Sequence, residues 1–150
     1  MKKMYASIAP ERVVLMGAKK QLNYNIHEVE ENEIKALWEK NENTGMPYDD
    51  FAERHKYGYY SLVVGGARWN YNDIVSEIVR AKYPEQDMEA ITNNMNASVG
   101  NFFNALVSDG IVGAIKYLKD SADEGNTIAF REMQEWRTKA KVWAREVFKK

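Results

Sequence analysis

The residue types that perform most enzymatic and metal chemistry are sparse in this chain. It has no cysteine and two histidines, His27 and His55, and neither histidine has a second histidine or a ligand-like carboxylate three or four residues away. A metal site needs several converging donors, and without cysteine there is no disulfide, thiolate site or cysteine nucleophile. We therefore expect no catalytic residue, no metal ligand and no cofactor, and we interpret both histidines as surface or strand-edge residues.

Two further patterns resemble functional motifs but lack the required spacing. Four glutamates lie between residues 28 and 33 without the Asp/Asn-Gly spacing of a calcium loop, so we interpret them as the solvated start of a helix. Gly65 and Gly66 lie outside any GxGxxG or GxxxxGK[ST] motif, so a tight turn explains them.

Aromatic and basic residues alternate between positions 54 and 71. Such a group can stack on single-stranded bases, form a protein interface, or simply border a strand with amphipathic rings. The formal net charge of -1 argues against nucleic acid, because the phosphate backbone binds basic surfaces. The candidate protein interface consists of Tyr57, Tyr59, Tyr60, Arg68, Trp69 and Tyr71, and the basic residues that nucleic acid would use are Arg54, Lys56 and Arg68.

The C-terminal end carries a narrow apolar seam at helical spacing. Its members are separated by alternating intervals of three and four residues, with charged or polar residues between them: Ala129, Met133, Trp136, Ala140, Trp143 and Val147. Two exposed tryptophans on one stripe would be a liability, so we expect both to be largely buried. Their partner is either the helix that begins near Asn72 or the same seam of another subunit.

Strands are expected in the first part of the chain. Residues 5–8, 13–16 and 21–27 have β-forming or alternating patterns, with connections too short for parallel crossovers, and residues 59–64 return to the same sheet. Helical turns are expected around Ile34, Leu37 and Trp38 and again over residues 49–55.

In the second half of the chain, apolar residues recur with a period of about 3.6 residues, which is typical of helices. A helix capped by Asn70 or Asn72 should end before Pro84, and a second should run from Glu85 to the neighbourhood of Asn93 and Asn94. A third apolar set, residues 102–118, is interpreted as a core helix kinked or split near Gly110. These patterns predict an α+β fold in which a small N-terminal antiparallel β-meander precedes a helical C-terminal half. We expect a single domain over residues 1–150, β-rich over 1–66 and helical over 70–150.

Composition excludes some classes of protein. Apolar residues make up 45% and charged residues 29% of the chain, which is typical of a folded domain. No run approaches the roughly 18 apolar residues of a membrane span, and the polar N-terminus does not resemble a signal peptide.

Three ordered motifs suggest a relationship. They are residues 5–15; Tyr71-x-x-Ile74-Val75-Ser76-x-Ile78-Val79-Arg80-x-x-Tyr83 followed by Ala90-Ile91-x-x-Asn94; and Trp136-Arg137-x-x-Ala140-Lys141. Together they cover about half the chain, and their order and spacing resemble those of small uncharacterised tail-region proteins of tailed phages and prophages of gut bacteria. Relative to that pattern, residues 34–57 and 97–119 resemble insertions.

The resemblance implies a non-enzymatic structural or assembly protein of a tailed bacteriophage, associated with the tail or virion and acting through protein–protein contacts. Its expected partners are other phage structural proteins and further copies of itself, with no nucleic acid and no membrane span. Its expected location is the virion, or the host cytoplasm during assembly. The alternative is a nucleic-acid-binding phage accessory protein.

Overall fold

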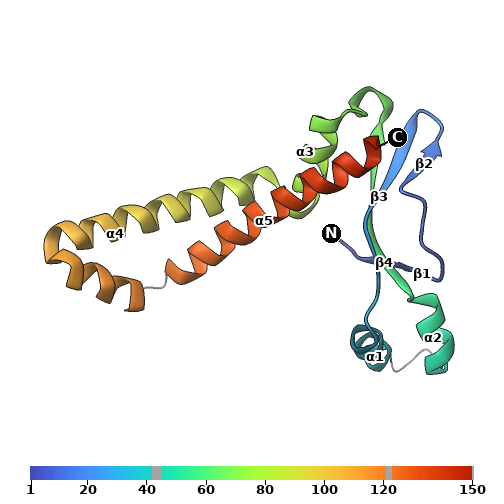
Figure 1. The fold of residues 1–150 in the computed structure, drawn as a ribbon, viewed down its shortest axis with the longest axis horizontal. Helices are drawn as coiled ribbons and strands as arrows, with labels where there is room; N and C mark the ends of the chain where they lie inside the picture. Colours follow the sequence, from blue (N-terminus) through green and yellow to red (C-terminus); the bar gives the residue numbers. More distant parts are fainter. Residues whose placement is uncertain (42–44, 121–122, 150) are drawn as a thin grey trace. The chain divides into compact units, whose positions relative to one another are not determined.

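The computed structural model of the chain describes residues 1–41, 45–120 and 123–149 (Figure 1). These residues separate into two compact units, one comprising Met1–Glu77 with Trp143–Lys150 and the other comprising Ile78–Val142. The boundary falls inside two helices, so each unit holds part of both. The units are described separately below.

The first unit is built on a four-stranded antiparallel sheet. Its strands are β1 (Met4–Ala6), β2 (Val13–Met16), β3 (Lys19–Glu28) and β4 (Tyr57–Gly65), in the order β1-β4-β3-β2. β2, β3 and β4 are neighbours in chain order, and β1 pairs with the outer edge of β4. The antiparallel sheet followed by helices confirms the predicted α+β fold.

The hairpin between β2 and β3 is closed by a tight turn. Gly17 has a φ of +61°, a conformation that glycine adopts without a steric penalty from a side chain. Further along β3 the pairing with β4 is interrupted between Tyr24 and His27. Asn25, inside this irregularity, has a φ of +52°, which is uncommon for a residue with a side chain.

Two short helices, α1 (Glu31–Lys40) and α2 (Tyr48–Arg54), lie between β3 and β4 in the sequence and at one end of the sheet (Figure 1). Both were expected from the pattern. They enclose a small core of Val29, Ile34 and Phe51. The ring of Phe51 stacks on His55 with centroids 3.8 Å apart, so His55 belongs to the packing of this subdomain.

The chain leaves β4 through a short 3-10 turn, η1 (Gly66–Arg68), and enters helix α3 (Tyr71–Lys82). Asn70 caps α3, because its side-chain oxygen accepts a 3.0 Å hydrogen bond from the backbone N–H of Asp73. The helix ends before Pro84, as predicted, since proline disfavours helical backbone at the preceding residue.

The second unit contains a helical hairpin. It is formed by most of α4 (Glu85–Asp120) and α5 (Asp123–Phe148), which run side by side together with the end of α3 (Figure 1). Asn126 on α5 donates a 3.0 Å hydrogen bond to the hydroxyl of Ser98 on α4. Among the described residues no helix combines the length and hydropathy needed to cross a membrane.

The prediction that a helix ends near Asn93 and Asn94 is wrong, because α4 continues through both residues. Asparagine has a weak helical preference that packing readily overrides. The break predicted near Gly110 is confirmed: Gly110 has φ +68° and ψ -161°, a combination essentially restricted to glycine. α4 therefore consists of two helical segments, residues 85–109 and 111–120, that meet at a corner.

Candidate functional site

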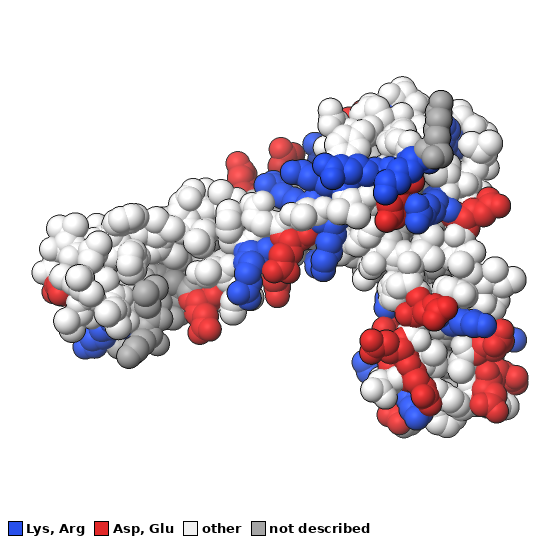
Figure 2. Space-filling view, in the orientation of Figure 1, with Lys and Arg blue, Asp and Glu red and all other residues white. Residues whose placement is uncertain are grey.

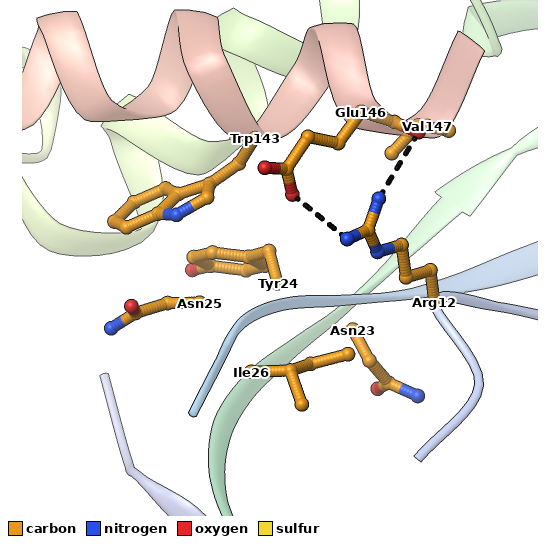
Figure 3. A pocket seen from close by; sticks show the side chains of 8 residues that line it. All are labelled: Arg12, Asn23, Tyr24, Asn25, Ile26, Trp143, Glu146 and Val147. Atoms are coloured by element: carbon orange, nitrogen blue, oxygen red, sulfur yellow. Dashed lines mark hydrogen bonds and ion pairs between the residues drawn. The ribbon is translucent and has the colours of Figure 1, made fainter. Parts of the chain in front are cut away.

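The first unit contains a small pocket between β3 and the last turns of α5 (Figure 3). Its volume is about 150 Å³, and one wall is made by the rings of Tyr24 and Trp143, whose centroids are 5.4 Å apart. The remaining lining residues are polar or aliphatic, namely Arg12, Asn23, Asn25, Ile26, Glu146 and Val147.

The charged groups at the mouth of this pocket neutralise one another. The guanidinium of Arg12 lies 3.4 Å from the carboxylate of Glu146 and donates a 3.4 Å hydrogen bond to the backbone carbonyl of the same residue (Figure 3). Burial and the nearby Tyr60 raise the pKa of Tyr24 to about 12, so its hydroxyl is neutral at pH 7. The pocket thus offers an aromatic wall, two asparagine amides and an ion pair.

A second polar cluster joins β1 to α1. Lys3 Nζ lies 2.6 Å from Glu33 Oε1, and the Tyr5 hydroxyl donates a 3.0 Å hydrogen bond to the same oxygen. The hydrogen bond from Lys3 lowers the pKa of Glu33, whereas burial and the bond to Glu33 raise the pKa of Tyr5 to about 12. Both shifts indicate an ionised carboxylate beside a neutral phenol. The ion pair and the hydrogen bond therefore connect the strand to the helix.

The histidines occupy the half-buried positions of a folded scaffold. His27 lies within 2.7 Å of the backbone oxygen of Asn25, and His55 lies equally close to that of Phe51. The part of the chain that the structure describes contains no group of three or more histidine and acidic residues able to hold a metal ion.

The candidate aromatic interface divides between different environments within the first unit. Tyr60 packs against Tyr24 at 5.7 Å between centroids, on the face of the sheet that carries Leu22. The ammonium of Lys20 lies 4.8 Å from the ring centroid of Trp69, and the ring of Phe148 lies 6.4 Å from the Trp69 ring between centroids.

The rest of the predicted interface is half-buried or already paired. Tyr57 and Tyr59 alternate with Tyr60 along β4 and are half-buried, as is Tyr71 at the start of α3. Arg68 is exposed and pairs with Glu77 at 2.9 Å.

The C-terminal seam is buried over most of its length in the second unit. Met133 and Ala140 are fully buried, and Trp136 is 7% exposed. The indole N–H of Trp136 donates a 3.2 Å hydrogen bond to the backbone oxygen of Ile78, and the ammonium of Lys82 lies 4.4 Å from its ring. α3 is therefore the intramolecular partner that the sequence suggested. Trp143 and Val147, in the first unit, are only half-buried beside the pocket.

The largest departure from the sequence analysis is on α4. The prediction that the apolar residues of 102–118 pack in the core is wrong for Phe103, Val107, Ile111 and Ile115, which are 56%, 86%, 71% and 47% exposed. We define the α4 surface by its exposed apolar side chains, which are Val99, Phe103, Val107, Ile111, Val112 and Ile115. The middle turns of α4, residues 90–108, carry no charged side chain, and Figure 2 shows this part of the chain largely white, in contrast to α5.

Two signals in the sequence mark this surface. Val99, Phe103, Val107 and Ile111 recur at intervals of four, and no lysine or arginine lies between Lys82 and Lys116. Apolar periodicity of this kind predicts a buried helix face. It does not tell whether the partner that covers the face belongs to the same chain. The contrast in charge between α4 and α5 is the sequence signal that distinguishes the α4 surface from a core face.

Comparison of the chain with protein-family models, with curated proteins and with solved structures finds no match.

Proposed function

We propose that this chain is a non-enzymatic structural or assembly protein of a tailed bacteriophage, associated with the tail or virion, and that it works through protein–protein contacts. The assignment to phages is supported by the three ordered motifs described above. The mode of action is supported by the α4 surface.

The observation that carries the proposal is the exposure of six large apolar side chains on one helix. Their exposed fractions run from 41% at Val99 to 86% at Val107, and they fall three on each side of the break at Gly110. Single apolar residues are normal on protein surfaces, but several large exposed ones on one element favour an interaction site.

The chemistry of the surface favours a protein as the partner. Between Lys82 and Lys116 the ionisable side chains other than Tyr83 are all acidic, including Asp109 next to the corner at Gly110. Nucleic acid binding depends on lysine and arginine contacts with phosphates, and amphipathic helices that bind anionic membranes carry lysine and arginine on the polar face. The stretch between Lys82 and Lys116 supplies neither, and Lys116 adjoins only its last residue, Ile115.

The proposal is tested by particle fractionation. Particles from a culture that expresses the chain are purified through two successive density gradients, and the ratio of the chain to the major tail protein is measured by mass spectrometry. We expect a constant ratio in the virions or in tail intermediates. If the chain remains in the soluble fraction at every stage of assembly, the proposed function is wrong.

A further inference from the structure

The sheet of the first unit has β1 and β2 as its outer strands (Figure 1). An outer strand carries a row of backbone N–H and C=O groups that no neighbouring strand uses, and proteins usually block this row with lysine, proline or an overlying element. β2 contains neither lysine nor proline, and three of its four residues are exposed. Its free edge is therefore open to a further strand.

The hydrogen-bonding pattern identifies which backbone groups of β2 point away from the sheet. In an antiparallel ladder, residues that exchange hydrogen bonds with the neighbouring strand alternate with residues whose N–H and C=O point outward. The N–H of Asn23 donates a 2.8 Å hydrogen bond to the carbonyl of Arg12, so the alternation starts with a bonded pair at Arg12. Val13 and Leu15, one and three residues further along, therefore direct their N–H and C=O groups toward the free edge. Among the described residues, no backbone hydrogen bond outside the strand ladders occupies these groups.

The side chains along this edge are apolar and exposed. Val14, Leu15 and Met16 are 37%, 75% and 51% exposed. Because successive side chains of a strand point to opposite faces, Val14 and Met16 lie on one face of the sheet and Leu15 lies on the other. On the face of Val14, the cross-strand row continues through Gln21 to Val63, which is 52% exposed. The edge is therefore apolar on both faces of the sheet.

The backbone groups and the side chains together specify the chemistry of a partner. The outward groups of Val13 and Leu15 provide two donors and two acceptors at the spacing of a β-ladder, and an extended polypeptide presents the complementary row. β2 carries no charge, so the residues that face it must be uncharged as well, because a charge buried without a partner is costly. An extended segment with apolar side chains meets both requirements.

A segment of another protein fits this edge better than the same edge of a second copy. In a self-pairing centred on Val14, Met16 of each copy would lie opposite Arg12 of the other. Arg12 lies outside β2, and its guanidinium is already paired with the carboxylate of Glu146 at 3.4 Å. A different segment can place an apolar residue at that position, which the second copy cannot do.

We infer that β2 is a docking edge for an extended, uncharged apolar segment of another protein, which adds to the sheet as a further strand by bonding to the backbone of Val13 and Leu15. This inference is independent of the proposed function, which rests on the three motifs and on the α4 surface.

The test uses the full chain and a synthetic strand probe, the acetylated and amidated peptide Lys-Thr-Val-Thr-Val-Thr-Lys. Nuclear magnetic resonance of the isotope-labelled chain measures how fast each backbone amide exchanges with solvent. We expect the peptide to slow the exchange of the Val13 and Leu15 amides, whereas those of Val14 and Met16, which are already bonded within the hairpin, change little. Unchanged exchange at Val13 and Leu15 with millimolar peptide would overturn the inference.

A pair of variants separates backbone recognition from side-chain recognition. Leu15→Pro removes one outward N–H, and proline is tolerated in an edge strand where the N–H faces solvent. The matched variant Leu15→Thr changes the side chain but keeps the N–H. We expect Leu15→Pro to weaken peptide binding about tenfold and Leu15→Thr by less than about threefold. Equal weakening in two variants that circular dichroism shows to be folded would contradict strand addition.

A methylated peptide makes the test independent of how the variants fold. Methylation of the backbone nitrogens of its valines and threonines removes the donors that a ladder needs, so this peptide should not slow the exchange of either amide. Equal effects of both peptides would refute backbone pairing. If instead the exchange of the Val13 and Leu15 amides slows as the concentration of the chain rises without any peptide, the edge pairs with a second copy and the partner inferred above is wrong.

Discussion

Trp136 connects α5 to α3 in the second unit, and its removal should be among the most destabilising single changes in the chain. The side chain is 7% exposed, its N–H donates a 3.2 Å hydrogen bond to the Ile78 carbonyl, and Lys82 covers its ring at 4.4 Å. Truncating a buried tryptophan to alanine costs about 3–5 kcal/mol, because the packing contacts are lost and a cavity remains. We expect Trp136→Ala to lower the free energy of unfolding by that amount.

A second substitution separates the contribution of the hydrogen bond from that of packing in the free energy lost by Trp136→Ala. Trp136→Phe keeps an aromatic ring in the seam but loses the hydrogen bond to Ile78, so it should cost about 1–2 kcal/mol, from one lost bond and some lost volume. Val142→Ala, at an exposed position of the same helix, should change stability by less than about 0.5 kcal/mol. The expected loss of stability therefore decreases from Trp136→Ala to Trp136→Phe to Val142→Ala.

Urea denaturation of the full chain, followed by circular dichroism at 222 nm, measures the series. Trp136, Ile78 and Lys82 all lie in the second unit, so a shift of the transition in Trp136→Ala reports the packing within that unit. The reasoning is refuted if Trp136→Ala unfolds within 1 kcal/mol of the parent, or if Val142→Ala is equally destabilised. Loss of self-association without loss of stability would instead place the seam at an interface.

The remaining predictions concern the corner, the two polar sites and nucleic acid. Gly110→Ala should destabilise the chain by about 1–3 kcal/mol in the same urea assay, because an alanine at φ +68° and ψ -161° is strained; an unchanged midpoint would contradict the backbone argument. Lys3 lowers the pKa of Glu33 in the folded chain, so the stability that Glu33 contributes is present above its unfolded pKa of about 4.5 and is lost as the pH falls through the lower folded pKa. The difference in unfolding free energy between the parent and Glu33→Gln should therefore shrink as the pH falls through the folded pKa. A difference that is independent of pH would be inconsistent with the ion pair. The pKa of Tyr24 is raised to about 12, so the stability linked to its neutral form is present below pH 10 and is lost as the pH rises through 12. Ultraviolet titrations of the parent and of Tyr24→Phe should therefore differ by one phenol that ionises near pH 12 rather than near pH 10. Fluorescence anisotropy should detect no binding to single- or double-stranded DNA at physiological salt, given the net charge of -1; micromolar, salt-sensitive binding abolished by Arg68→Ala would favour the nucleic-acid alternative.

The sheet and the ends of several helices were predictable because local chemistry specifies them. Pro84 ends α3, Asn70 caps its start, and Gly110 breaks α4, each through a backbone constraint that is visible in the sequence. The β-forming residues 59–64 predict the central part of β4, which extends from Tyr57 to Gly65. Its pairing with β1 depends on contacts more than 50 residues apart in the chain, which no local pattern encodes.

The candidate sites were less predictable, because burial depends on the partner that each face finds. Trp136 and Trp143 occupy equivalent positions on one seam, yet Trp136 is buried against α3 whereas Trp143 is half-buried beside the pocket. The apolar residues of α4 follow the same periodicity as a core helix, yet Val107 is 86% exposed. In both cases the sequence identifies a face, and only the structure shows what covers it.

The most direct measurement of the central claim is the yield of complete particles when the α4 surface is altered in a genetic background that lacks the wild-type chain. Cells are complemented with the parent, Val107→Asp or Val142→Asp at equal protein levels, and complete particles are counted by electron microscopy and infectious titre. An assembly protein that acts through the α4 surface predicts normal yield with Val142→Asp and a loss of at least tenfold with Val107→Asp, with incomplete particles accumulating. Equal particle yields with both variants would contradict an assembly role for the α4 surface.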